Sequence, residues 1–179
     1  MHVLEPNVML VPTLAPWGRP MDTEARKSLV ALVRQQHTAA LGTLRDGSPL
    51  VSLVLFACAP DLSEFYIHVS RLAQHTGGLL ADPRAGLLII ENGSPSRNPL
   101  SLSRVSIQGV AAVLEEESAA FSTSRLQYLA AHPAARMNFG LSDFLLFRIR
   151  PQACRFVAGF GKIFDLDEPA WQRLSAETT

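Results

Sequence analysis

The chain has 179 residues, and 16 lysines and arginines balance 16 acidic residues, so its formal net charge is zero. A neutral chain lacks the broad basic field that nucleic-acid binders use, and no apolar run approaches the length of a membrane span, so we expect neither nucleic acid nor membrane as a partner. This length suits one domain with a proper hydrophobic core.

The N-terminus and the two cysteines favour a cytoplasmic protein. Residues 1–21 contain no basic segment followed by an apolar core, so they are not a secretory signal. Cys58 and Cys154 are far apart in apolar surroundings, which is typical of buried thiols rather than of a disulfide. The chain has no CxxC, HExxH or Walker-type motif, and we therefore expect no metal site.

The N-terminal residues 1–20 contain four prolines, which favour an extended arm ahead of a single domain at residues 21–179. A helix over residues 22–36 follows, with Asp22 or Thr23 as its cap and one apolar face. Alternating or continuous apolar runs then predict the strands. The predicted strands are residues 38–44, 50–58, 64–69, 87–90, 104–114, 144–150 and 154–164, and the further helices are residues 70–82, 115–132, a short one from 134, and 169–174.

The strand pattern predicts a small antiparallel barrel. Short turns join the first three strands, which indicates an antiparallel meander. A strongly twisted sheet of six or seven strands tends to close, because closure removes its exposed edges. We therefore expect a mainly β fold, namely a β-barrel with peripheral helices.

Residues able to bind a phosphate gather where the 64–69 strand meets the next helix. Ser70, Arg71, His75 and Thr76 lie there. If the helix begins at Ser70 or Arg71, its free N–H groups and positive dipole end favour an anion, with the Arg71 guanidinium as a bidentate partner. The plainer interpretation is a serine that caps the helix beside a solvated arginine and histidine.

Several local strings, in order, resemble the flavin-binding split-barrel family, whose best-known member is pyridoxamine 5'-phosphate oxidase. The resemblance covers residues 25–164, and the strings that carry it are Phe65-Tyr66, Ser70-Arg71, His75 and Asp82-Pro83-Arg84. In that family this turn holds the phosphate of FMN. The resemblance implies a split barrel that binds FMN and acts as an oxidoreductase on a small-molecule substrate, with the flavin supplying the redox chemistry.

The same resemblance assigns cofactor-binding residues by position. The phosphate site would consist of Ser70, Arg71, His75 and Thr76, the flavin ring would lie along Val51, Ser52, Leu53 and Val54, and Arg104 would reach the flavin. Leu72 stands where the oxidase has a second cation, so His75 is expected to compensate. Barrels of this family are usually homodimers with FMN at the interface, which implies a homodimer here. The resemblance assigns no catalytic acid or base.

Within the superfamily, the chain is most similar to the HugZ-like heme-utilization branch. The strings that carry this likeness are residues 79–84, Asn98-Pro99-Leu100-Ser101 and residues 157–162. The likeness implies an alternative function, heme binding or heme degradation. Some members of the branch place a heme-ligating histidine in an additional C-terminal domain, whereas the last histidine here is His132. The candidate axial ligands are therefore His37, His68, His75 and His132.

A third alternative is a flavin-free barrel that only binds a ligand or partner. The missing second cation at Leu72 favours this alternative, and a fold by itself does not establish a function.

Overall fold

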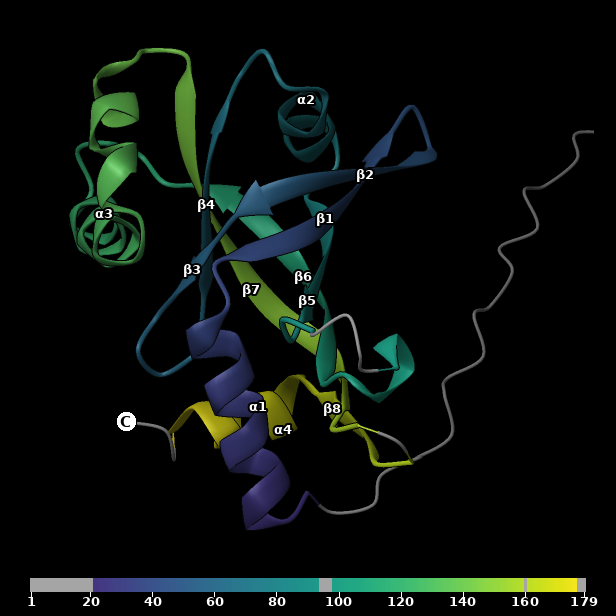
Figure 1. The fold of residues 1–179 in the computed structure, drawn as a ribbon. Coiled ribbons are helices and arrows are strands. Elements are labelled where there is room, and N and C mark those ends of the chain that lie inside the picture. Colours follow the sequence, from purple (N-terminus) through teal and green to yellow (C-terminus); the bar gives the residue numbers. More distant parts are fainter. Residues whose placement is uncertain (1–20, 94–97, 160, 177–179) are drawn as a thin grey trace, which may run out of the picture.

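The computed structural model describes residues 21–93, 98–159 and 161–176 (Figure 1). The predicted arm at residues 1–20 lies outside the described residues. The strands are β1 (Thr38–Arg45), β2 (Ser48–Leu55), β3 (Ala57–Cys58), β4 (Phe65–Ser70), β5 (Arg84–Ile90), β6 (Arg104–Val113), β7 (Phe144–Val157) and β8 (Ile163–Asp167). The helices are α1 (Thr23–Gln35), α2 (Gln74–Ala81), α3 (Ala119–Ala131) and α4 (Glu168–Ala176), with short 3-10 helices η1 (Pro99–Ser101) and η2 (Pro133–Gly140).

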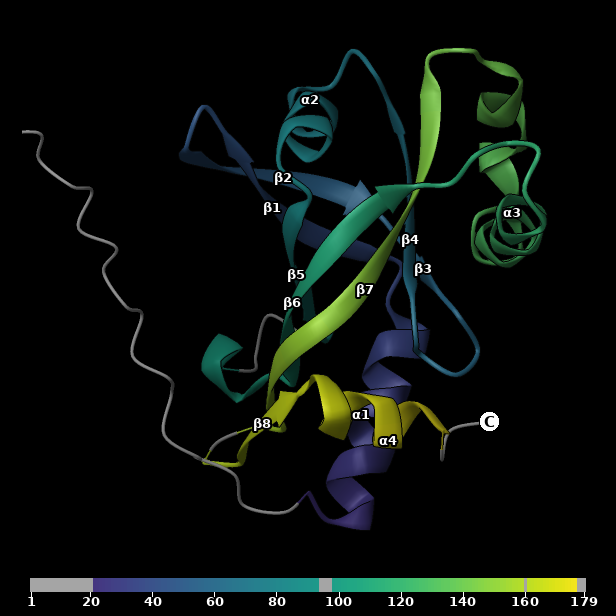
Figure 2. The same ribbon diagram turned by 180° about the vertical axis from the view of Figure 1, so that it is seen from behind.

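The described strands form one curled antiparallel sheet. Its order is β2-β1-β5-β6-β7-β4-β3, and β8 also pairs with β7. The long strand β7 carries β6 on one side and, on the other, β4 along its first half and β8 along its second (Figure 2). The predicted mainly β split barrel with peripheral helices is therefore confirmed.

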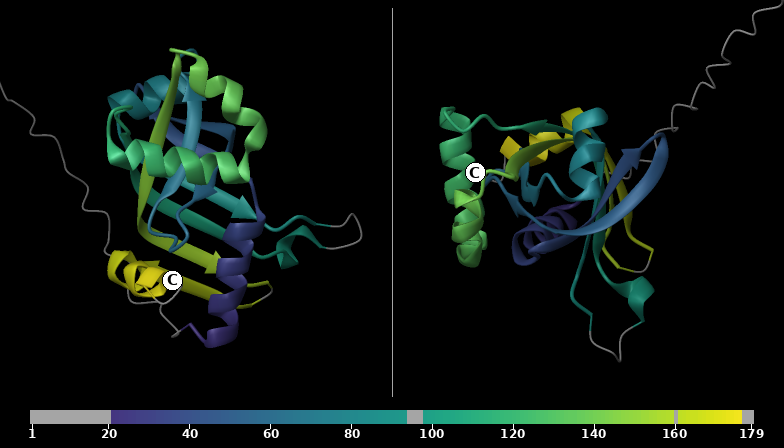
Figure 3. Two further views of the ribbon diagram at one scale, coloured as in Figure 1. Left: turned by 90° about the vertical axis from the view of Figure 1, so that its left-hand side faces the viewer. Right: turned by 90° about the horizontal axis from the view of Figure 1, so that it is seen from above.

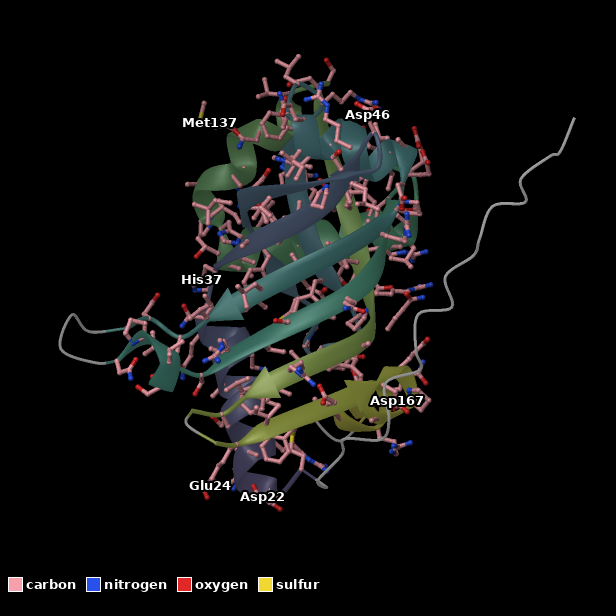
Figure 4. All side chains as sticks on the ribbon, turned by 90° about the vertical axis from the view of Figure 1, so that its right-hand side faces the viewer. Asp22, Glu24, His37, Asp46, Met137 and Asp167 are labelled. Carbon is pink, nitrogen blue, oxygen red and sulfur yellow. The ribbon has the colours of Figure 1, made fainter. Side chains whose placement is uncertain are left out.

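Alternation of side chains gives the sheet a buried inner face and an exposed outer face. One inner row crosses β1, β5, β6, β7 and β8, and all its members are buried: Leu41, Leu87, Ile107, Cys154 and Leu166. The adjacent outer row consists of Leu53, Ala40, Leu88, Ser106, Arg155 and Asp165. Figure 4 looks onto this outer face, and no described helix lies over its central strands.

Helices pack at both ends of the sheet. Asp22 caps α1 as predicted, because its Oδ1 accepts a hydrogen bond from the Ala25 amide at 2.7 Å. The buried face of α1 includes Leu29 and Val33. α1 and α4 lie together at one end of the sheet, whereas α3 and η2 lie beside β4 and β7 at the other end (Figures 1 and 3).

Several predicted boundaries near the candidate site are wrong. The helix expected from residue 70 begins at Gln74, and the one expected from residue 115 begins at Ala119, because a turn precedes each helix. The predicted antiparallel meander is confirmed in two steps: β1 pairs with β2, and β3, which is the end of the predicted 50–58 strand, pairs with β4. β4 also pairs with β7 on its other side.

The strands predicted at residues 144–150 and 154–164 are arranged differently in the structure. Residues 144–157 form the single strand β7, because a register shift between Gln108 and Gly109 places Pro151 opposite Gly109 and accommodates a residue without an N–H. The second predicted strand bends at two glycines instead, with φ of 91° at Gly159 and 80° at Gly161, and the chain returns as β8.

Both cysteines are free thiols, as predicted. Cys154 is buried, and burial raises the pKa of the half-buried Cys58 to about 11, so both thiols stay protonated near neutral pH. None of the helices described here combines the length and apolar character that crossing a bilayer requires.

Helix α4 stabilises the turn that precedes β4. The indole N–H of Trp171 donates to the Leu62 carbonyl at 2.9 Å, and both side chains are almost fully buried. The Ser175 hydroxyl donates to the carbonyl of Asp61 in the same turn. Leu62 has a φ of 63°, which a bulky residue rarely adopts, so these two hydrogen bonds support a strained backbone.

We expect Trp171→Phe to lower the free energy of unfolding by about 1–3 kcal/mol, because the buried Leu62 carbonyl loses its donor. Urea denaturation of the purified protein would measure the change. Gln172→Ala, at an exposed position on the same helix, is the control and should change stability by less than about 0.5 kcal/mol. Equal stability of Trp171→Phe and the wild type would show that the hydrogen bond contributes nothing.

Candidate functional site

The turn between β4 and α2 is held by a residue from a distant part of the chain. Ser70 pairs with Phe144 at the last position of the β4–β7 ladder. The next residue, Asp143, therefore lies opposite Arg71. The Ser70 hydroxyl donates to Asp143 Oδ2 at 2.7 Å, and the Arg71 backbone N–H donates to the Asp143 carbonyl at 2.6 Å.

Most other donors of this turn are used inside the turn itself. The Thr76 hydroxyl donates to the Ser70 carbonyl at 2.6 Å, and Thr76 is fully buried. The Leu72 amide donates to Ser70 Oγ at 3.1 Å, and the Ala73 amide donates to the Ser70 carbonyl, also at 3.1 Å. Ser70 therefore does not cap the helix, which starts after Ala73 with no side-chain cap.

The groups that remain available to a ligand are few. Arg71 is exposed, and its guanidinium makes no hydrogen bond or ion pair with another described residue. His75 is half-buried, its Nε2 has no partner among the described residues, and burial lowers its pKa, so its ring is neutral near pH 7. Beside them, Leu72 is 88% exposed. The turn thus presents one cation, the amides of Gln74 and His75, which have no acceptor among the described residues, and an apolar side chain, whereas Nε2 of His75 is enclosed by protein atoms.

The predicted flavin strand lies near this turn but does not present a single face. α2 packs closely on the β1–β2 hairpin: a Cβ on Gly78 would approach the Leu44 carbonyl to 2.8 Å. On β2, Val51 and Leu53 point outward and are 70% and 78% exposed, whereas Val54 points inward and is buried. Ser52 pairs with the buried Leu41 and also belongs to the inner face.

Arg104 lies at the other end of the sheet from α2. It pairs with Ile90 at the end of β5, whereas Arg84, at the start of β5, follows α2 closely. Its Nη1 donates to the carbonyls of Leu100 and Leu102, both at 3.2 Å. The structure therefore brings the predicted turn and strand together within one chain, but it does not bring Arg104 to them.

Asp143 is the site residue that sequence reasoning missed. It is 73 positions from Ser70, and no motif contains both residues. The signal that exists in the sequence is indirect: correct pairing of the alternating strand at residues 144–150 with β4 would have placed Asp143 beside the turn.

The histidines named as axial ligands lie in different environments. His132 is buried with Nε2 2.8 Å from the Phe56 carbonyl, and His68 stacks on Phe139 with ring centroids 3.8 Å apart. The Nδ1 of His68 and the Nε2 of His75 are enclosed by protein atoms. His37 is the exposed histidine of the described residues, with its ring edge-on to His132 at 5.6 Å (labelled in Figure 4).

Burial and the nearby Arg125 guanidinium lower the pKa of His68 to about 4. The ring also contacts Tyr128 edge-on at 5.9 Å, so it connects β4 to α3 and η2 as a neutral aromatic group. Among the residues that the structure describes, no group of three or more His, Cys, Asp or Glu side chains is arranged to hold a metal ion.

Comparison with known proteins places this geometry in context. The sequence matches the family model described as pyridoxamine 5'-phosphate oxidase over residues 25–158. It is 38% identical to the chloroplastic heme oxygenase HOZ of Arabidopsis thaliana over 122 residues, which are 66% of this chain but 35% of that protein. It is 26% identical to the heme oxygenase HutZ of Vibrio cholerae over 137 residues, 74% of this chain and 76% of HutZ.

Among solved structures, a heme binding protein from Mycobacterium smegmatis superposes with a TM-score of 0.76 at 28% identity, covering 87% of this chain and 61% of that one. The chain therefore spans about a third of the plant relative and about three fifths of the mycobacterial structure.

Stability should fall as the pH drops from about 6.5 to about 4, because His68 titrates near 4 in the folded protein and near 6.5 when unfolded. In this window the unfolded state binds more protons, so acid favours unfolding. His75, whose pKa is also lowered, acts in the same direction. Urea midpoints measured across the window should show a smaller slope for His68→Phe, which keeps a stacking ring but cannot titrate. An unchanged slope would show that His68 does not titrate as expected.

Proposed function

The chain belongs to the pyridoxamine 5'-phosphate oxidase family, and from that premise we propose that it is a heme-binding protein of the heme-utilization type. Two relatives, HOZ and HutZ, are named as heme oxygenases, and the superposing mycobacterial protein is named as a heme binding protein. From these relatives we infer only the ligand, heme, for this chain and not their whole activity.

One structural observation supports heme over FMN: the hydroxyl protons at the turn are already used. A phosphate monoester carries up to two negative charges and several acceptor oxygens, so it needs many donors. Ser70 and Thr76 each have one hydroxyl proton, and these protons go to Asp143 and to the Ser70 carbonyl. A heme propionate needs fewer donors, because a single guanidinium can bind both of its oxygens, and Arg71 offers one.

The outer face of β2 suits the apolar plane of a porphyrin. Val51, Leu53 and Leu55 are 70%, 78% and 47% exposed along this strand, and the small residue Ala40 lies between Leu53 and Leu88 in the adjacent positions of the sheet. Packing a macrocycle against these side chains would remove apolar surface from water. Apolar side chains along the strand and a cation at the neighbouring turn together match a flat ligand with acidic substituents.

His37 is the histidine best placed to ligate iron at the end of this strand. Its carbonyl accepts a hydrogen bond from the Phe56 amide at 3.1 Å, and the next residue, Thr38, pairs with Leu55. Its ring is exposed, unlike those of the other described histidines. In this arrangement β2 would bind the macrocycle and exclude water. His37 lies at the end of β2 opposite to the end where α2 packs, so in a homodimer Arg71 of one chain would orient a propionate and His37 of the other would hold the metal. Bound heme iron would supply oxygen binding and one-electron chemistry.

FMN is the second candidate ligand, and one feature of the turn favours it. The exposed Arg71 lies beside the start of α2, where the amides of Gln74 and His75 have no acceptor among the described residues. Free amides and a cation at a helix N-terminus favour an anion. An absorption spectrum with each cofactor separates the candidates, since FMN gives two flavin bands and hemin gives a Soret band. If the protein bound neither FMN nor hemin, the remaining alternative would be a flavin-free barrel that binds another ligand or a partner.

A homodimer is part of the proposal, because the half of the outer face around Leu53, Ala40 and Leu88 is apolar and no helix among the described residues covers it. A second copy lying on it would bury Leu53, Leu88 and their neighbours, and it would bring its own Arg104 toward the turn before α2, which is far from Arg104 within one chain. Two free thiols suit a cytoplasmic, reducing location for such a dimer.

We expect light scattering to give twice the chain mass, and Leu53→Glu to give the monomer mass, because an unpaired carboxylate at the centre of an apolar interface is costly. Leu126→Glu is the control, since Leu126 is similarly exposed, at 71%, but lies on α3. A monomeric wild type would remove the homodimer from the proposal.

Titration of the wild type with hemin should give a saturable Soret band. Arg71→Ala should make the binding free energy for hemin less favourable by about 1–2 kcal/mol, because one charge-assisted contact to a propionate is lost. Arg45→Ala, an exposed arginine at the end of β1 in the β1–β2 hairpin, is the control and should bind like the wild type. His37→Ala should shift the Soret maximum, whereas His132→Ala should not. A wild type that shows no Soret band with hemin would refute the proposed function.

A further inference from the structure

The contact between Asp143 and Ser70 places a carboxylate inside the turn that the family uses for phosphate. Asp143 is half-buried, and its side chain and its carbonyl both accept hydrogen bonds from the turn, from the Ser70 hydroxyl at 2.7 Å and from the Arg71 amide at 2.6 Å. A ligand oxygen near Ser70 Oγ would therefore lie beside a negative charge, with no hydroxyl proton directed at it.

The geometry allows little rearrangement that would free these donors. The position of Asp143 is set by the pairing of Ser70 with Phe144, the last pair of the β4–β7 ladder. Ser70 Oγ also accepts from the Leu72 amide, and its carbonyl accepts from both Thr76 Oγ1 and the Ala73 amide. Turning the Ser70 hydroxyl toward a ligand would leave the Asp143 carboxylate without its donor, at a cost that increases with its burial.

We propose that Asp143 determines the ligand specificity of this turn: its carboxylate excludes phosphate monoesters such as FMN and leaves Arg71 to bind a singly charged carboxylate. Both ligand classes are anionic, but they differ in charge and in the number of donors they need. A phosphate near Ser70 faces repulsion from Asp143 and lacks hydroxyl donors, whereas a propionate on the exposed Arg71 guanidinium can stay farther from Asp143. This inference rests on the proposed function, because it explains why the turn favours heme over FMN.

The test compares FMN binding by the wild type, Asp143→Asn and Asp143→Ala, measured as quenching of flavin fluorescence on titration with full-length protein. Asp143→Asn removes the charge with little change in shape, and Asp143→Ala frees the Ser70 proton. Each should raise FMN affinity by about tenfold or more, the equivalent of one charge-assisted hydrogen bond. Adding Leu72→Lys to Asp143→Asn should raise it further, because it restores a second cation.

Asp46→Asn is the matched control. Asp46 lies on the β1–β2 turn with its side chain 93% exposed, and the substitution changes the net charge by the same amount as Asp143→Asn. Thermal unfolding of every variant verifies that it folds. If Asp46→Asn gave the same gain in FMN affinity, the effect would be one of overall charge and the inference would be wrong.

Hemin titration of the wild type, run in parallel, distinguishes failure of the proposed heme-binding function from failure of the specificity role of Asp143. Hemin binding by the wild type together with a gain of FMN binding in the Asp143 variants supports both. Hemin binding without any gain in folded Asp143 variants overturns the specificity inference alone. No hemin binding, with the gain still present, overturns the proposed function and leaves the role of Asp143 in excluding phosphate supported. Tight FMN binding by the wild type would overturn the inference directly.

Discussion

The antiparallel pairing of β4 with β7 is the constraint on which the candidate site depends. It places Phe144 opposite Ser70 and so brings Asp143 to the turn that leads into α2. The segment between β6 and β7, which contains α3 and η2, returns to the sheet at this point. His68 on β4 packs against Phe139 of that segment, so the same contacts that anchor the helical segment also position the acid. A change in this pairing would move the carboxylate and every donor that it engages.

Which ligand the turn can bind depends on which acceptors its hydroxyl protons already bind, and not only on which residue types are present. Serine, threonine, arginine and histidine together resemble a phosphate site, but a hydroxyl has a single proton to donate. Once Asp143 and the Ser70 carbonyl accept those protons, Arg71 is the strong donor left for a ligand. The apolar outer strand nearby then weighs toward a ligand that is mostly hydrophobic and only weakly acidic, as a porphyrin is.

In the proposed function, the outer face of the sheet serves both ligand binding and dimer formation. Its apolar half, around Leu53, Ala40 and Leu88, adjoins a charged half in which Arg155 forms an ion pair with Asp165 at 2.7 Å. A partner that covers the apolar half would complete a pocket which one chain leaves as an open surface. The separation of Arg104 from the turn is consistent with this proposal, because in the proposed homodimer a second copy would bring its Arg104 toward the turn.

Much of the fold could be predicted from the sequence, because the relevant signals are local. The cap at Asp22 is a short-range hydrogen bond, and the alternation of β6 reflects burial of every second side chain. The predicted gap between the strands at residues 144–150 and 154–164 was wrong for a non-local reason: the register shift that accommodates Pro151 lies on the neighbouring strand, near Gly109. The meander formed as predicted, whereas the pairing of β4 with the distant β7 is a non-local contact that no turn signal indicates.

The sequence by itself determined the mainly β class and the family, and it selected the candidate turn, since each depends on residues close together in the chain. Only the tertiary structure decided that Val51 and Leu53 face outward while Val54 is buried, that His37 is exposed while His132 is not, and that Arg104 lies far from the turn. It also decided which group accepts the hydrogen bond from the Ser70 hydroxyl. That outcome depends on an acceptor 73 residues away, which strand pairing brings within 2.7 Å and which no local pattern records.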